Sequence, residues 1–200
     1  MIYIIDCLFK EFMQKDFSML KIFSGFMAGL VLVAVLVYNL FGNLMFKETL
    51  SPFGVEETVA RVQQNIQKVG NGWALVGLRE PAKAVQADGG NVLPVMLIEA
   101  CSTKYSGPIL KNDDVRFLSL LIPCKVSVYK KNDGKTYIGT MNAGLVGRMF
   151  GTEVGEIMSH VSADQAKFLI FDASKPAPAI VRPAPPGASG GAGGAPAGGC

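Results

Sequence analysis

The chain has 200 residues, of which 50% are hydrophobic and 18% are charged, with a formal net charge of +3 at pH 7. This apolar content is too high for a disordered chain. The small positive charge, without Lys and Arg clustered among aromatic residues, argues against nucleic acid as a partner. The length predicts one or two domains, and the distribution of apolar residues decides how they are arranged.

The most apolar part of the sequence is a run without any charged residue at positions 22–46. It exceeds the ~20 residues that a helix needs to cross a ~30 Å hydrocarbon core. It also lacks the small residues at which a signal peptide is cleaved. We therefore predict an uncleaved transmembrane helix over 22–46. Gly25, Ala28 and Gly29 within this helix are small enough to let another membrane helix pack closely against it.

The flanking lysines predict how this helix is oriented. Lys10, Lys15 and Lys21 precede the apolar run, whereas Lys47 alone follows it closely. Basic residues remain mainly on the cytoplasmic side of a membrane. Residues 1–21 are therefore predicted to be cytoplasmic and the rest of the chain to be periplasmic or otherwise extracytoplasmic. The protein is predicted to be a single-pass protein of the bacterial cytoplasmic (inner) membrane, with the lipid bilayer as its first partner.

The end of the chain, at residues 174–200, is rich in Pro, Ala and Gly and is predicted to be disordered. It finishes at Cys200, which is either a point of coupling to a partner's cysteine or an incidental thiol. One domain remains, at residues 51–173. A domain of this size can bury a core without the help of a metal ion or a disulfide bond.

Apolar residues at 55, 59, 62, 66 and 69 predict that this domain begins with an amphipathic helix over 55–69. Strands are predicted at 73–78, 93–101, 117–129 and 136–141, with a polar loop at 81–91 and helices at 143–150 and 153–171. Asn132-Asp133-Gly134 predicts a hairpin between the last two strands. Antiparallel strands with helices at the ends predict an α+β fold, a small two-layer α/β sandwich with a mainly antiparallel sheet.

Several stretches of the domain resemble the family known as domain of unknown function 302, over roughly residues 52–172. They are Glu57-Thr58 followed by Gly70, Glu99-Ala100-Cys101, residues 121–129 with Pro123-Cys124, Asp133-Gly134-Lys135 and Thr140-Met141-Asn142. The resemblance implies a small α+β fold similar to the TATA-binding-protein class, and homodimers, but no established reaction. The sequence departs from the family pattern at Ser102-Thr103, where many members have Asn, and Gly107-Pro108 is expected to shorten or break the next helix.

Cys101 and Cys124 are the main candidate site residues, and both fall on cysteine positions of this family. Three interpretations remain open. They are buried thiols, a disulfide or redox pair, or ligands of a soft metal ion such as Cu(I). Met141 is a candidate thioether ligand for the last of these. Met149 and Met158 lie in the same half of the domain.

No catalytic residue and no cofactor are predicted. His160 is the single histidine, and no second ligand accompanies it at helical spacing, so a surface or half-buried position on a helix is expected. Asp113 and Asp114 precede a strand and are expected to act in a turn or cap. Glycines 144, 147 and 151 lack the pattern of a phosphate-binding loop and are expected to serve turns or close packing.

These observations predict a non-enzymatic, membrane-anchored extracytoplasmic binding or assembly module, such as an accessory subunit of a membrane protein complex. Its partners would be a second copy in a homodimer or other membrane protein subunits. Two alternatives stay open. One is a cell-envelope redox or copper-handling protein that uses Cys101 and Cys124. The other is a small-ligand sensor with a pocket between the sheet and the loop at 81–91.

Overall fold

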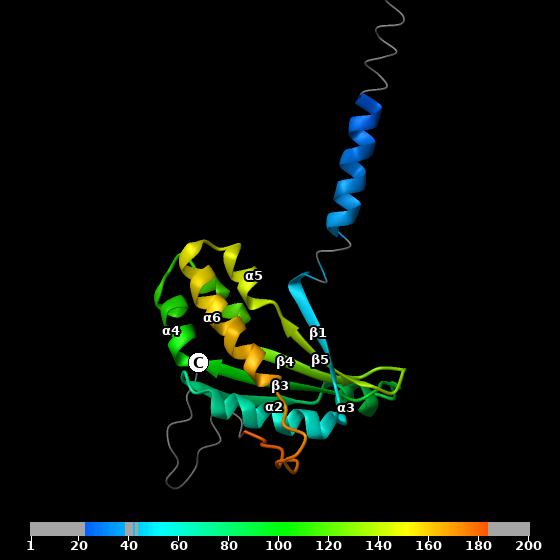
Figure 1. Ribbon diagram of the computed structural model, residues 1–200, viewed down its shortest axis with the longest axis vertical. Coiled ribbons are helices and arrows are strands. Elements are labelled where there is room, and N and C mark those ends of the chain that lie inside the picture. Colours follow the sequence, from blue (N-terminus) through cyan, green and yellow to red (C-terminus); the bar gives the residue numbers. More distant parts are fainter. Residues whose placement is uncertain (1–22, 39–41, 43, 184–200) are drawn as a thin grey trace, which may run out of the picture. The chain divides into compact units, whose positions relative to one another are not determined.

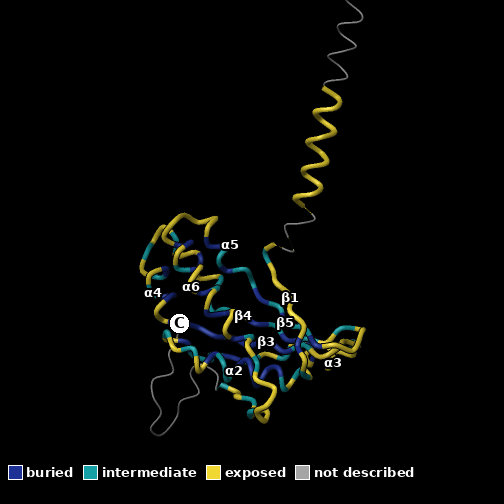
Figure 2. Tube along the Cα trace, in the orientation of Figure 1, coloured by how far each residue is buried: buried dark blue, intermediate teal, exposed yellow. Residues whose placement is uncertain are grey.

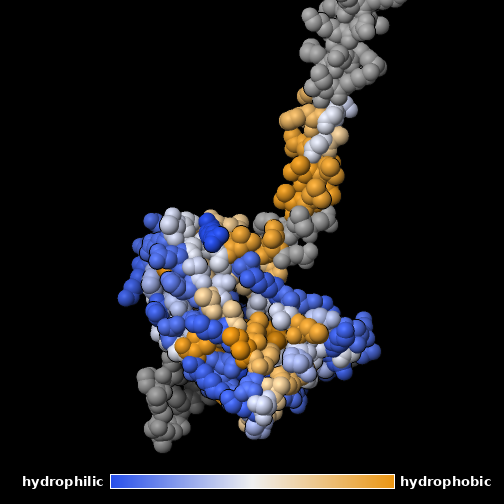
Figure 3. Space-filling model, in the orientation of Figure 1, coloured by the Kyte–Doolittle hydropathy of each residue, from blue (hydrophilic) through white to orange (hydrophobic). Residues whose placement is uncertain are grey.

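The computed structural model describes residues 23–38, 42 and 44–183. The chain divides into two compact units, Met1–Asn43 and Leu44–Cys200, each of which is described by itself. In the first unit, residues 23–38 form an exposed helix, and its surface is mainly apolar (Figure 3). In the described ranges, no helix is both long enough and apolar enough to cross a membrane. The predicted cytoplasmic segment 1–21 lies outside these ranges.

The second unit is built on a five-stranded antiparallel sheet with the strand order β1-β5-β4-β3-β2 (Figure 1). Its strands are β1 (Phe46–Ser51), β2 (Trp73–Arg79), β3 (Val95–Ser102), β4 (Cys124–Lys130) and β5 (Thr136–Met141). The strands from β2 to β5 follow one another as neighbours, and β1 is added at the edge next to β5. The predicted α+β class with an antiparallel sheet is confirmed.

Helices that contribute to the core pack against one face of this sheet. They are α2 (Val55–Val69), α4 (Thr103–Lys111), the 3-10 helix η1 (Arg116–Leu121), α5 (Ala143–Arg148) and α6 (Thr152–Phe168). The short helix α3 (Pro81–Ala87) contacts β3. The core forms where alternate strand residues, such as Ile98, Val128 and Ile138, meet apolar residues of α2 and α6. Figure 2 shows the buried trace running through the central strands and the inner side of α2.

The predicted helix at 55–69 is confirmed with the same bounds. Its first turn contains Glu56 and Glu57 and its last turn contains Lys68, and these charges interact favourably with the helix dipole. Gly70 follows with a φ of 76°, a backbone conformation that favours glycine and ends the helix. The predicted strand at 136–141 and the hairpin before it also form, because their signals are local in the sequence.

Three segments between residues 81 and 129 differ from the sequence predictions. The apolar run at 117–129 is not one strand, since η1 occupies its first part and β4 begins only at Cys124. Pro123 precedes this start, and a proline has no N–H for a strand ladder. The predicted loop at 81–91 contains α3, which begins with Pro81 at its first position. Gly107-Pro108 does not break α4, which continues through Pro108 to Lys111.

The start of the second unit shortens the predicted membrane helix. Phe46 is the first residue of β1 and pairs with Met141. Asn142 donates its side-chain amide to the Leu44 carbonyl at 2.9 Å and its backbone N–H to the Met45 carbonyl at 2.7 Å. Residues 44–46 therefore belong to the folded domain. An apolar edge strand that directly continues an apolar run cannot be separated from it by composition.

The segment after α6 also differs from the prediction, because residues 174–183 lie along α2. Gln63 is fully buried, and its side chain exchanges two hydrogen bonds with the backbone of Val181, at 2.7 and 2.8 Å. Arg61 donates to the carbonyls of Asp172 and Lys175, both at 2.8 Å. The domain thus extends to residue 183, and the remainder of the predicted tail, with Cys200, lies outside the described residues.

Candidate functional site

The sheet has a second face, which the helices leave open. Residues of this face occupy matched register positions on neighbouring strands, in the row Leu50, Tyr137, Tyr129 and Val95. Leu50 is exposed and the other three are half-buried. A row of apolar and aromatic side chains across four strands is a surface that a partner could cover. We call these four residues the open-face row.

Polar contacts fix the two tyrosines of this row. Tyr129 and Tyr137 stack with ring centroids 6.2 Å apart. The Tyr129 hydroxyl donates a hydrogen bond to Glu48. Glu48 also accepts a hydrogen bond from Lys131 Nζ at 2.6 Å. Burial, and then the hydrogen bond to Glu48, raise the pKa of Tyr129 to about 12. Tyr129 is therefore protonated at neutral pH and serves as a hydrogen-bond donor that holds β1 against β4.

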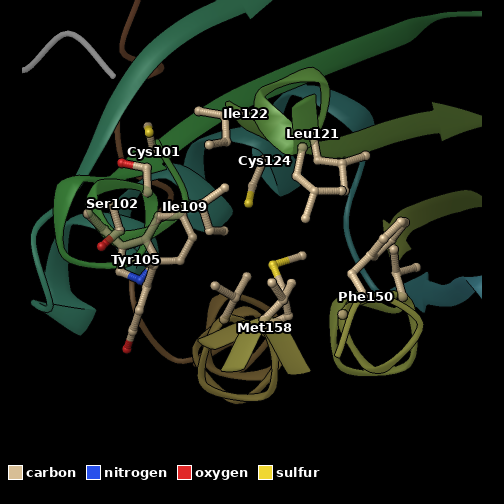
Figure 4. Close-up of a pocket in the computed structure, with 16 residues that line it drawn as sticks. Cys101, Ser102, Tyr105, Ile109, Leu121, Ile122, Cys124, Phe150 and Met158 are labelled. Carbon is tan, nitrogen blue, oxygen red and sulfur yellow. The ribbon is translucent and has the colours of Figure 1, made fainter. Parts of the chain in front are cut away.

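An apolar cavity lies on the helical side of the sheet, among β3, β4, α4, η1, α5 and α6 (Figure 4). Its volume is about 30 Å³. Trp73, Tyr105, Leu118, Ile122, Phe150 and Met158 are among the residues that line it. A cavity of this size holds a very small number of atoms, whereas pockets for ordinary small molecules measure about 300–1,000 Å³.

Two sulfur atoms point into this cavity. Figure 4 shows the Cys124 thiol and the Met158 thioether directed toward the same space from opposite walls. Cys124 is a free thiol. Burial raises its pKa to about 11, and this effect outweighs the charge of nearby Lys125, which acts in the opposite direction. The thiol is therefore protonated at neutral pH, which makes it a poor nucleophile.

Cys101 and Cys124 are both among the residues that line the cavity, whereas Met141 is not, and the two cysteine side chains point in different directions (Figure 4). Cys124 pairs with Ala100 on the helical face, so Cys101, the next residue of β3, faces the other side. Met141 lies on that other side as well, because its neighbour Thr140 pairs with the buried Val126. Cys101 is disulfide-bonded while Cys124 is a free thiol, so the two are not bonded to each other.

A buried carboxylate that the sequence analysis missed lies next to the cavity. Asp164 on α6 is 2% exposed. Its Oδ2 accepts hydrogen bonds from Asn71 Nδ2 at 2.9 Å, Trp73 Nε1 at 3.0 Å and Tyr105 Oη at 2.9 Å. Its Oδ1 accepts Lys167 Nζ at 2.8 Å. We call these residues the Asp164 network.

The Asp164 network holds three separate parts of the fold together. Burial by itself would raise the pKa of Asp164, but the hydrogen bonds, of which the one from Lys167 has the largest effect, lower it to about 2. Burial and the carboxylate raise the pKa of Tyr105 in turn. A sequence signal was available: Asp164 follows Val161 by three positions and precedes Phe168 by four, so it lies on the buried stripe of α6.

The remaining predicted residues take structural positions. His160 is exposed on α6, and its ring stacks on the ring of Tyr105 with the two centroids 6.4 Å apart. Asp113 pairs with Arg116, and the Asn112 side chain accepts the Asp114 N–H at 3.0 Å. Over the described ranges, no group of three or more His, Cys, Asp or Glu residues could hold a metal ion.

Gly25, Ala28 and Gly29 lie on the helix of the first unit, where all side chains are exposed. A Cβ atom added to Gly25 or Gly29 would meet nothing within 4 Å. Their predicted packing against another helix stays a prediction.

Comparison with known proteins gives a family match and similar solved structures. The family described as Domain of unknown function DUF302 matches residues 47–171. A crystal structure of an uncharacterized conserved protein DUF302 from Bacillus stearothermophilus is similar with a TM-score of 0.56 and 20% sequence identity, over 62% of this chain and 95% of that chain. At this identity the likeness shows the fold alone. No curated protein matches the chain.

Proposed function

The chain belongs to the DUF302 family, whose description assigns no activity, and from this premise we propose that it is a non-catalytic, membrane-anchored binding and assembly module. In this proposal the folded domain lies outside the cytoplasm and associates through its open sheet face with a second copy of the chain. The observation that carries the proposal is the open-face row, Leu50, Tyr137, Tyr129 and Val95.

The chemistry of the open face suits a second copy. In an interface between identical copies related by a two-fold axis, the same patch must complement itself. The open face carries both signs of charge, with Glu48 and Lys131 beside the tyrosines and the Arg79–Glu99 pair on the neighbouring strands. Two copies can therefore place their open-face rows against each other, while carboxylates of one copy approach cations of the other. Aromatic residues such as tyrosine are also enriched in protein interfaces.

The proposed anchor is the apolar segment that precedes β1. With residues 44–46 assigned to the domain, the uncharged run at 22–43 remains, which still meets the ~20 residues needed for a spanning helix. Lys10, Lys15 and Lys21 before the run support a cytoplasmic N-terminus. The described helix at 23–38 lies within this run.

Replacing Val95 with aspartate is expected to convert the dimer into a monomer, because it places an unpaired charge in the proposed apolar contact. The full chain would be extracted in a mild detergent and its mass measured by native mass spectrometry. Ile170→Asp is the matched control: Ile170 is 70% exposed and lies after α6, away from the open face. A dimer for the wild type and the control, with a monomer for Val95→Asp, is the expected result.

A wild-type chain that is monomeric in this experiment contradicts the dimer proposal. A Val95→Asp variant that stays dimeric contradicts the use of the open face. Gly25→Leu then tests whether the first helix makes the contact instead. Far-UV circular dichroism of each variant verifies that the fold is kept.

A second candidate function, the handling of a soft metal ion, is favoured by the two sulfur atoms of the cavity. Cys124 and Met158 supply a thiol and a thioether, the ligand types that Cu(I) prefers. The raised pKa of Cys124 weakens this candidate at neutral pH, because the metal ion must displace the thiol proton. The small-ligand sensor is not favoured, since α3 occupies the predicted loop and the cavity lies elsewhere.

Copper retention distinguishes this second candidate from the first. The reduced full chain would be loaded with Cu(I), passed through a desalting column and analysed for bound copper. If the cavity binds Cu(I), Cys124→Ser and Met158→Leu each lose copper relative to the wild type, while Met149→Leu, at a methionine that is 58% exposed, does not. Equal copper content in all four proteins rules the cavity out as the metal site.

A further inference from the structure

Exposed apolar side chains gather at one end of the folded domain. Leu44, Phe46, Phe117, Leu120, Met149 and Phe150 account for half of the exposed large hydrophobic residues between positions 44 and 183. They include all three exposed phenylalanines of this described range. We call these six residues the apolar end. Leu120 is the most prominent of them, with 85% of its surface exposed.

The strand register explains why residues so far apart in sequence share one end. Phe46 at the start of β1 pairs with Met141 at the end of β5, and β4 begins at the same end of the sheet. The 3-10 helix η1 lies just before β4 and contributes Phe117 and Leu120. The short helix α5 follows β5 and leads to Met149 and Phe150. The apolar end is therefore a product of the fold.

Contacts join the parts of the apolar end. The rings of Phe117 and Phe150 meet edge to face with centroids 5.8 Å apart. Asn142, at the start of α5, holds Leu44 and Met45 through the hydrogen bonds of 2.9 and 2.7 Å already described. The residues that precede β1 are thus fixed to the same structure that carries Met149 and Phe150.

Two cations border this surface. Lys47 follows Phe46, and Arg148 precedes Met149. Both are exposed, and neither forms an ion pair with another described residue. Exposed aromatic and aliphatic side chains with basic residues at their margin are the composition of surfaces that lie in a membrane interface. Phenylalanine and leucine enter the acyl boundary there, and lysine and arginine meet the lipid phosphates.

We propose that the apolar end rests on the phospholipid bilayer, with Lys47 and Arg148 at the level of the headgroup phosphates. This inference rests on the anchor of the proposed function, because the apolar run at 22–43 leads directly into Leu44. The lipid surface is favoured over a protein partner for this reason. The residues nearest to the anchor in the chain are themselves part of the exposed apolar surface.

Docking of this end has a consequence for assembly. The strands of the sheet run away from the apolar end, so the open-face row is turned sideways, along the membrane rather than toward it. A second anchored copy diffusing in the same bilayer then meets the open face in a suitable orientation. The bilayer would restrict the orientations that two copies must search before they associate.

Tryptophan quenching tests the proposed lipid contact. The full chain carrying Leu120→Trp would be reconstituted into vesicles of phosphatidylcholine and phosphatidylglycerol, with or without bromine on the acyl chains. Brominated lipid is expected to remove most of the emission that the new tryptophan adds. Ile170→Trp is the matched control, because α6 with its 17 residues separates residue 170 from the apolar end by about 25 Å. It is expected to show no added quenching.

The native Trp73 is 9% exposed in the core, so the wild-type emission gives both the background and a check of folding. Unquenched Leu120→Trp overturns the docking, whatever the state of the anchor. A separate variant, Phe26→Trp, reports on the anchor: its quenching supports the proposed membrane helix, and its absence contradicts it. Docking and anchoring can therefore fail independently.

Discussion

Replacing Asp164 with alanine is expected to lower the free energy of unfolding by about 3–5 kcal/mol. The variant leaves Trp73 Nε1 and Tyr105 Oη without an acceptor in a buried site. Each buried donor that loses its partner costs about 1–3 kcal/mol. Urea denaturation of the full chain in detergent, followed by far-UV circular dichroism, measures the change.

Asp172→Ala is the matched control for this variant. Asp172 is also a carboxylate with a pKa lowered to about 2, through Ser174 and Lys175, but half of its side chain is exposed. Its removal is expected to cost little stability, as for other exposed ion pairs. Equal losses for the two variants would contradict the central role of the Asp164 network.

The pH dependence of unfolding gives a second readout of the same carboxylate. The pKa of Asp164 is about 2 in the fold, below its ordinary value of 3.8. Its stabilising effect is therefore complete above pH ~5 and is lost as the pH falls toward 2. The lowering of this pKa from 3.8 to about 2 corresponds to about 2 kcal/mol of folding stability at neutral pH. The stability gap between wild type and Asp164→Ala is expected to narrow over this acid range.

Replacing Gly147 with alanine is expected to destabilise the domain by about 1–3 kcal/mol. A Cβ atom at this position would lie 2.3 Å from the Met158 Cβ and 3.0 Å from the Val154 carbonyl. These atoms are close to the α6 backbone and cannot swing aside, so α5 and α6 would have to separate. Chemical denaturation under the conditions used for Asp164→Ala measures the loss.

Gly144 provides the control within the same helix. A Cβ atom there would meet its nearest neighbour, the Ser162 Cβ, at 3.5 Å, which is an ordinary contact. Because alanine is favoured over glycine in a helix by about 0.5–1 kcal/mol, Gly144→Ala is expected to be neutral or stabilising. A loss of stability at both positions would indicate a general intolerance of α5 to substitution, and not the close approach at Gly147.

The sequence by itself determined the elements whose signals are local. The helix at 55–69 follows from its apolar spacing, and the hairpin between β4 and β5 follows from Asn132-Asp133-Gly134. Both patterns act over a few residues, so periodicity and turn chemistry are enough to predict them. The α+β class followed from the order of these elements, and the family stretches supported it.

Tertiary structure alone decided which distant residues meet. β1 pairs with β5, which lies some ninety positions later in the chain. This pairing, which composition does not reveal, places residues 44–46 in the folded domain although they belong to the apolar run. Register parity placed Cys101 and Cys124 on opposite faces of the sheet, although both occupy family cysteine positions. A side chain's direction in a strand alternates with each residue, so a pairing shift of one position would reverse this result.

Contacts between distant segments also explain why the sequence analysis missed the Asp164 network and the apolar end. Asp164 is recognisable in the sequence as a charge on an apolar helix stripe, but its partners Asn71, Trp73 and Tyr105 come from two other segments. The apolar end likewise combines residues before β1, in η1 and after α5. Composition and spacing thus specified the elements with local signals and the fold class, whereas the packing of the elements created the buried network, the cavity and the exposed surfaces.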